Sequence, residues 1–169
     1  MSKAFYFIRK AQNDNGYWYP LWFGNQSATD HKNPVYGTAK VAIYLKDSMM
    51  CGSLDTSMKK DIEKLLSDAW QYLLKQQNRD GSWGGEAGVR GTMEETALAI
   101  SALTEKDRDA CHRGFEWLEN EYRQHGLRSA PIGVYFAMLW YDEKLYPLIY
   151  YIEAIRRFLK PAEGFQCAT

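Results

Sequence analysis

One stretch of this sequence is written twice, and this repeat constrains the fold more than any other feature. AFYFIRKAQNDNGYWY spans residues 4–19, and AWQYLLKQQNRDGSWG spans residues 69–84. A Gln, a Gly and a Trp recur at the same spacing in both copies, as Gln12, Gly16 and Trp18 and as Gln77, Gly81 and Trp83. A weaker third copy begins at Gly114 and keeps the glycine as Gly126. Internal repeats of this kind indicate one structural unit that is used several times.

Each copy predicts a helix that ends in a defined turn. Positions i, i+3, i+4 and i+7 from Ala69 share one helical face, and this helix is expected to start near Met58. Gly81 can adopt the left-handed conformation that closes a helix. The Trp two residues later is expected to fold back against the helix end. The Gln is expected to lie in the last turn, where its amide can bond free carbonyl groups and neighbouring loop amides. We call each set of Gln, Gly and Trp a clamp.

A second kind of helix follows each clamp. Residues 92–95 read as a capping box, with Thr92 as the N-cap and the side chain of Glu95 reaching back. This box opens the apolar helix ETALAISALTE, and residues 36–38 open the comparable helix TAKVAIYLKDSM. Residues 132–159 are expected to form two further helices, separated near 142–147. The sequence therefore predicts an all-α chain of about six or seven alternating outer and inner helices, in a single domain over 1–169.

Bulk composition excludes several classes of protein. Lys plus Arg and Asp plus Glu both number 21, so a broad nucleic-acid surface is not expected. No apolar run is long enough for a signal peptide or a membrane-spanning helix, which favours a cytoplasmic protein. The three cysteines, Cys51, Cys111 and Cys167, form no disulfide framework. Cys111 and His112 lack further ligands at metal spacing, so no metal and no cofactor are expected.

The clamp, in the loose form aromatic–x–x–x–Gln–x–x–x–Gly–x–Trp, resembles the repeat of squalene–hopene and oxidosqualene cyclases. Trp22 and Tyr36-Gly37-Thr38 resemble the Trp and Tyr-Gly-Thr that follow a clamp in those enzymes. The stretch 131–148 resembles the aromatic C-terminal end of their catalytic barrel domain. The resemblance covers nearly the whole chain and implies an α/α toroid. Because that toroid has six helix hairpins, this chain would form its C-terminal half.

The resemblance also implies a reaction, the cyclisation of a polyene by protonation, in an isomerase. The family's acid is an Asp-x-Asp-Asp motif that lies upstream of the matching region. The nearest string here, Asp107-Arg108-Asp109-Ala110, lacks the third Asp and is expected in an exposed turn. Protonating an alkene needs a strong and positioned acid. Glu94 and Glu95 are neighbours on a helix and are expected to cap it, so the chain is expected to be inactive alone.

The resemblance assigns a pocket-lining role to five aromatic residues, namely Trp22, Tyr36, Tyr135, Phe136 and Tyr141. Ring faces stabilise carbocations through cation–π contacts. The alternative for each residue is ordinary core packing. Two departures weaken the case for hopene formation, because Ser129-Ala130 and Val134 stand where the family has phenylalanines. The clamp residues are expected to brace helix ends without touching substrate.

A half barrel is expected to expose its inner helices, including the apolar faces 97–103 and 134–141. In the first hypothesis, the chain docks on a missing N-terminal half and supplies the aromatic wall of an isoprenoid-binding or triterpene-binding cavity. In the second, it is a stand-alone, non-catalytic half barrel that binds an isoprenoid lipid or a protein, as a homodimer. Either form is compatible with peripheral contact at a membrane surface. A weaker third hypothesis, a carbohydrate-acting α/α barrel, needs two facing carboxylates.

Overall fold

The computed structural model describes residues 3–50 and 54–159, so Cys51 and Cys167 lie outside the described residues. The described helices are α1 (Lys3–Ala11), α2 (Pro34–Met50), α3 (Thr56–Gln76), α4 (Met93–Leu103), α5 (Arg108–His125) and α6 (Tyr146–Leu159). Two short 3-10 helices are η1 (Thr29–His31) and η2 (Tyr135–Ala137), and the two strands are β1 (Ile132–Val134) and β2 (Leu139–Tyr141). This mainly helical architecture confirms the predicted all-α class.

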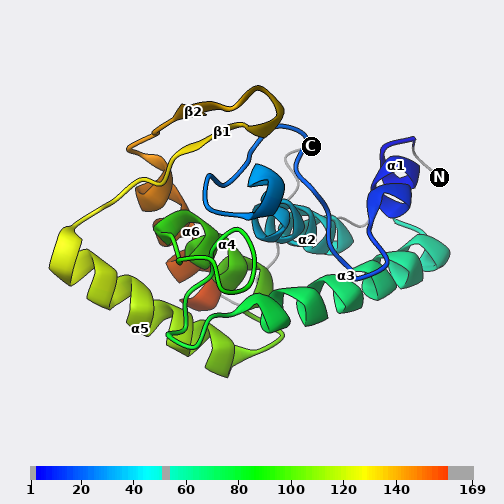
Figure 1. The fold of residues 1–169 in the computed structure, drawn as a ribbon. Helices are drawn as coiled ribbons and strands as arrows, with labels where there is room; N and C mark the ends of the chain where they lie inside the picture. The colour runs from blue at the N-terminus through cyan, green and yellow to red at the C-terminus, as the bar shows by residue number, and fades with distance from the viewer. Residues whose placement is uncertain (1–2, 51–53, 160–169) are drawn as a thin grey trace.

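The helices alternate between two layers. α4 lies between α2 and α6, while α3 packs on α2 and α4, and α5 packs on α4. Figure 1 shows α3 and α5 along one side of the molecule and the β1–β2 hairpin on the opposite side. Tyr36 contacts Tyr150 near the start of α2 and α6, and Asp47 contacts Arg157 further along both, so these two helices run in the same direction. We call α2, α4 and α6 the inner helices and α1, α3 and α5 the outer helices.

Helix α4 forms the centre of the core. All of its residues are buried, and small side chains such as Ala97, Ala99 and Ala102 let its neighbours approach closely. The expectation that face 97–103 would be exposed is therefore wrong, because α2, α5 and α6 cover it within the single chain. The exposed apolar side chains lie instead on α6, where Ile149 is 52% and Ile152 is 56% accessible to solvent.

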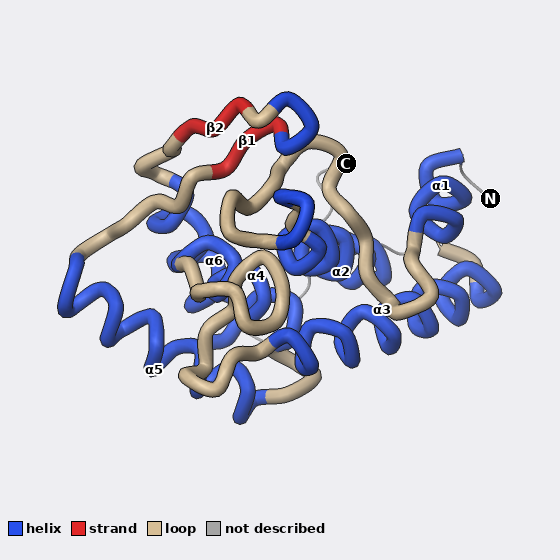
Figure 2. Tube along the Cα trace, in the orientation of Figure 1, coloured by secondary structure: helices blue, strands red, loops and turns tan. Residues whose placement is uncertain are grey.

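Residues 132–141 form an antiparallel hairpin, and the helix expected there is wrong (Figure 2). Ile132 pairs with Tyr141 and Val134 with Leu139. The hairpin is also bonded to the loop before α2, through a bridge from Phe23 to Val134. β-branched and aromatic residues suit strands as well as helices, and a short apolar run does not distinguish the two by periodicity. Here the pairing of β1 with β2, together with the bridge to Phe23, accompanies the extended conformation.

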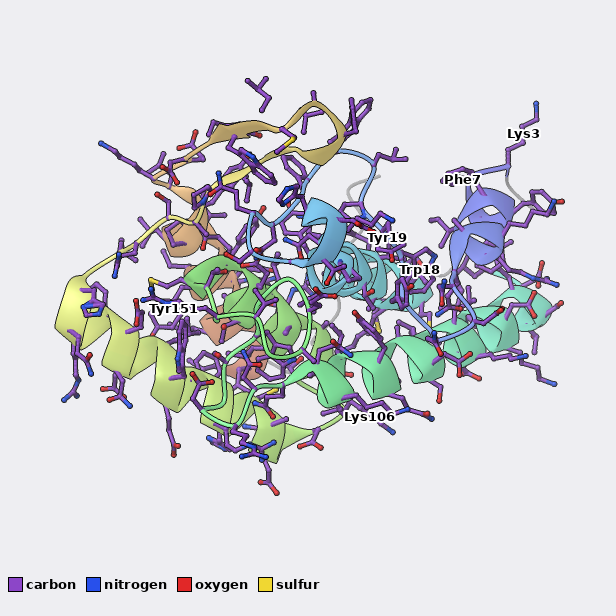
Figure 3. The ribbon with its side chains drawn as sticks, viewed as in Figure 1. Lys3, Phe7, Trp18, Tyr19, Lys106 and Tyr151 are labelled. Carbon is purple, nitrogen blue, oxygen red and sulfur yellow. The ribbon has the colours of Figure 1, made fainter. Side chains whose placement is uncertain are left out.

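In each clamp, the Trp ring folds back onto the preceding outer helix. Trp83 donates its ring N–H to the carbonyl of Leu73 at 2.7 Å, and its backbone N–H donates to Oγ1 of Thr96 at 3.0 Å. Trp18 makes the corresponding bonds to Ile8 at 2.8 Å and to Thr38 at 3.1 Å. Figure 3 labels Trp18 in the region between α1 and α2. Each Trp therefore joins the end of an outer helix to the following inner helix.

The Gln of each clamp reaches the next outer helix. The Gln77 side-chain amide donates to the carbonyls of Gly81 and Ala110, both at 2.9 Å. Gln12 donates to the carbonyls of Gly16 and Leu65, both at 3.0 Å. The expected bond to the neighbouring loop is present, at the carbonyl of Gly81 or Gly16, but the second acceptor lies on the next outer helix and not on the helix that precedes the Gln. Gln12 and Gln77 follow directly after their helices, and the Trp ring bonds the carbonyl near the helix end.

Candidate functional site

A groove of about 570 Å³ crosses the three inner helices. It is lined by Lys40, Ile43, Tyr44, Asp47, Leu98, Ile149, Tyr150, Ile152, Glu153 and Arg157. Leu98 lies between the contributions of α2 and α6, because α4 is the central helix. The volume falls in the range of small-molecule sites, and the middle of the groove is aliphatic and aromatic.

Lys40 marks one end of this groove. Its ammonium nitrogen lies 5.3 Å from the ring centroids of both Tyr44 and Tyr150. No carboxylate of the described residues forms an ion pair with Lys40. The Tyr150 hydroxyl is 3.0 Å from that of Tyr36, and burial raises the pKa of both phenols. This end of the groove is therefore positively charged and lined by neutral hydroxyl groups.

An ion-pair network marks the other end. Arg157 donates two hydrogen bonds to Asp47, at 2.7 and 2.6 Å, and a third to Glu153 at 2.6 Å. Arg156 also bonds Glu153, and these arginines hold the pKa of that carboxyl below its usual range. The bidentate bond to Asp47 ties α6 to α2 across the groove.

The four predicted aromatic residues whose side chains are described do not lie together in one cavity. The exposed rings of Trp22 and Phe136 lie 6.2 Å apart on the hairpin side of the molecule, and Tyr141 is 45% exposed at the end of β2. Tyr36 is buried, and its ring contacts Phe23 at 5.3 Å. The backbone of Tyr135 begins η2, and its side chain lies outside the described residues.

The residues that line the groove were missed at the sequence level. Ile149 and Ile152 on α6 occur at helical spacing, as do Lys40 and Tyr44 on α2, but periodicity identifies a helix face without naming its partner. Tyr36 is linked to the groove through its hydroxyl contact with Tyr150.

Glu95 does not have the capping role that was predicted for its side chain. Thr92 is the N-cap of α4, as expected, and accepts the Glu95 backbone N–H at 3.2 Å. The Glu95 carboxylate instead accepts hydrogen bonds from the side-chain amides of Asn25 at 3.1 Å and Asn33 at 2.8 Å. It therefore ties the loop before α2 to the first turn of α4.

Glu94 connects the first turn of α4 to the segment before the hairpin. Its carboxylate accepts the backbone N–H of Ala130 at 2.9 Å. Burial raises the pKa of Glu94 to about 7 and also raises the pKa of Glu95. In each carboxyl, Oε2 is buried without a hydrogen-bond partner among the described residues. Neither carboxyl lines the groove. Ser129 and Ala130 line a separate cavity of about 190 Å³ near the start of α4.

The acid string at 107–110 begins a helix, so the exposed turn predicted there is wrong. Asp107 is the N-cap of α5, and its carboxylate accepts the backbone N–H of Ala110 at 2.8 Å. The described residues contain no group of three or more His, Cys, Asp or Glu side chains arranged to hold a metal. Cys111 is buried, which raises the pKa of its thiol to about 12. None of the helices described here is long and apolar enough to cross a membrane.

Comparison with known proteins agrees with this architecture. The squalene-hopene cyclase C-terminal domain family matches residues 1–132. A squalene–hopene cyclase of Bradyrhizobium diazoefficiens is 28% identical over 135 residues, which cover 72% of this chain and 18% of that protein. The apo structure of the type II terpene cyclase MstE from Scytonema has a TM-score of 0.54 at 20% identity, covering 70% of this chain and 32% of that one.

The structural likeness supports the predicted α/α toroid fold, in which inner and outer helices alternate. This chain spans about a fifth of the length of the curated relative that it matches. The family match includes both clamps, α2 to α5 and the start of the hairpin. On the strength of that match, the chain belongs to the squalene-hopene cyclase C-terminal domain family.

Proposed function

We propose that this chain, as one domain over 1–169, forms the C-terminal half of an α/α toroid that binds an isoprenoid. In a complete squalene–hopene-type triterpene cyclase, it would supply one wall of the cavity. The acid that protonates the polyene would come from another segment, since the sequence contains no Asp-x-Asp-Asp motif. The chain alone would then not cyclise a triterpene.

The observation that carries this proposal is the groove across the inner helices. Its middle presents Leu98, Ile149, Ile152 and the ring of Tyr150. The hydrocarbon chain of a linear isoprenoid is apolar and has no hydrogen-bonding groups, so an aliphatic and aromatic groove matches its chemistry. Ile155, which is also exposed on α6, extends this surface beyond the groove.

We also propose roles for the predicted aromatic residues. Tyr36 would contribute to the groove indirectly, because its hydroxyl contacts the hydroxyl of Tyr150, which lines the groove. Trp22 and Phe136, with Tyr135 and Tyr141, would line the cavity from the hairpin once the toroid is closed. The clamp residues would stay outside the site, since their hydrogen bonds join outer helices to their neighbours.

Binding of farnesol, a neutral isoprenoid, to the full chain tests the proposal. Ile152→Glu places a charge in the groove at a position that is 56% exposed, so the variant is expected to fold. Binding is expected to weaken about tenfold or more, because a carboxylate in an apolar site disfavours a hydrocarbon chain. Leu127→Glu is the matched control, since Leu127 is 41% exposed and does not line the groove. Equal binding by both variants would contradict the proposed site.

A second candidate function is a stand-alone isoprenoid-binding or protein-binding homodimer. It is favoured by the exposed apolar residues of α6, which are Leu148, Ile149, Ile152, Ile155 and Leu159. Two copies could cover this surface by a twofold contact. This candidate predicts a dimer of the purified chain, whereas the first predicts a monomer.

We further propose a cytoplasmic location with peripheral contact to a membrane surface. A neutral triterpene partitions into a bilayer, so a protein that receives one needs access to the membrane. Exposed Phe7 and Leu21 are apolar residues that support such contact.

A further inference from the structure

Within the proposed isoprenoid site, the groove has a charge asymmetry that a hydrocarbon ligand does not require. Lys40 lies at one end and makes no ion pair with any carboxylate of the described residues. Its ammonium group lies over the rings of Tyr44 and Tyr150 and reaches the Tyr44 hydroxyl at 3.5 Å. Desolvating a cation beside an apolar groove costs free energy that a purely hydrocarbon ligand does not return.

At the opposite end of the groove, the positively charged groups are already bonded to carboxylates. There, Arg157 is shared between Asp47 and Glu153, and Arg156 also bonds Glu153, so two guanidinium groups balance two carboxylates. Between the two ends lie Leu98 and Ile152, which offer apolar contact only. A ligand with an apolar chain and one anionic end would therefore bind in a single orientation, with its anion at Lys40.

We propose that the groove binds a phosphorylated isoprenoid, with its phosphate or diphosphate at Lys40 and its chain along Leu98 and Ile152. A lysine ammonium is a common ligand of phosphate oxygens. The hydroxyl pair of Tyr36 and Tyr150 lies beside this end, where one hydroxyl can donate to a phosphate oxygen while accepting from the other. This inference rests on the proposed isoprenoid-binding function and narrows its substrate class.

Calorimetric titration of the full chain with farnesyl diphosphate, farnesol and inorganic pyrophosphate tests the proposal. Farnesyl diphosphate is expected to bind about tenfold or more tightly than farnesol, in a salt-dependent manner. Pyrophosphate alone is expected to bind weakly, because it cannot use the apolar part of the groove. Lys40→Gln is expected to remove the preference for farnesyl diphosphate over farnesol.

Two matched variants make the result specific to Lys40. Lys40→Arg keeps the positive charge and is expected to retain the preference. Lys60→Gln removes an exposed lysine from α3, away from the groove, and is expected to change nothing. Thermal unfolding of each variant checks that it folds, since Lys40 is only partly buried.

The outcomes distinguish failure of the phosphorylated substrate from failure of the isoprenoid-binding site. Equal binding of farnesyl diphosphate and farnesol, unaffected by Lys40→Gln, would overturn the phosphorylated substrate and leave the isoprenoid site intact. Pyrophosphate binding as tight as that of farnesyl diphosphate would show an anion site without a chain site, which also overturns it. If neither isoprenoid binds, the proposed function itself fails.

Discussion

At the residue scale, two adjacent glutamates at the start of α4 hold different parts of the chain. Glu95 receives the amides of Asn25 and Asn33, and Glu94 receives the backbone of Ala130. The loop before α2 and the segment before the hairpin are thus fixed to one helical turn. Because both carboxyls are almost completely buried, their protonation states contribute to the free energy of folding.

Glu94 is expected to make stability decrease as pH rises. Burial raises the pKa of the Glu94 carboxyl to about 7 in the folded chain, whereas its ordinary value is 4.5. Between these two pH values, the folded chain keeps a proton on this carboxyl that the unfolded chain releases. The stabilisation is complete below about pH 4.5 and is lost as pH rises through about 7, by roughly 3 kcal/mol. Glu94→Gln removes this dependence, while that of Glu95, which has the same sign, remains.

Urea unfolding midpoints measured across this pH range check the prediction. The Glu94→Gln variant should lose less stability between the two ends of the range than the wild-type chain does. Glu116→Gln, at an exposed position on α5, is the control and should follow the wild type. Identical pH dependence in all three proteins would contradict the buried role assigned to Glu94.

The sequence predicted which residues of α4 begin the helix but not where their side chains point. Thr92 was identified as the N-cap because capping is a local interaction within four residues. The partners of Glu95 lie 62 and 70 residues away, and no local pattern identifies them. The groove was missed for the same reason, since Lys40, Leu98 and Ile152 come from three separate helices.

At the element scale, the clamps fix how successive outer helices pack. Gly81 has φ +93°, and a Cβ there would lie 2.5 Å from the carbonyl oxygen of Arg113 on α5. Gly16 has φ +88° and lies equally close to Asp68 on α3. The repeated glycine therefore allows a close approach between the turn and the next outer helix, in addition to permitting the turn itself.

Gly81→Ala tests this close approach. The substitution adds backbone strain at positive φ and a steric clash with α5, and it should lower the free energy of unfolding by about 2–4 kcal/mol. Gly88→Ala is the matched control, because Gly88 also has positive φ, at +78°, but has no described heavy atom within 4 Å of its Cβ position. It should cost only about 1 kcal/mol. If denaturant unfolding gave equal losses of unfolding free energy for the two variants, the close approach to α5 would contribute nothing to the effect of Gly81→Ala.

The hairpin is the element that sequence patterns predicted incorrectly. Residues 132–141 lack charged residues and carry aromatic and β-branched side chains, which fit either a helix or a strand. Pairing of Val134 with Phe23 depends on the loop before α2 being held in place. Helices bounded by a clamp were predictable, because their end signals lie within the repeat itself.

At the scale of the whole molecule, the three inner helices present one side to the groove and the outer helices cover the other. Gly126 ends α5 with φ +69°, yet no described heavy atom lies within 4 Å of its Cβ position, unlike Gly16 and Gly81. α5 is therefore an open edge of the outer layer in the described residues. The exposed isoleucines of α6 form the corresponding open edge of the inner layer.

Native mass spectrometry of the purified full chain, without and then with farnesol, tests the central claim that another half must complete this toroid. The account predicts a monomer that carries no lipid and takes up one farnesol when it is added. The open edges at α5 and α6 would then be covered by a different segment. A stable homodimer that already holds an apolar adduct would contradict the account, because it would show that two copies of this chain close the cavity themselves.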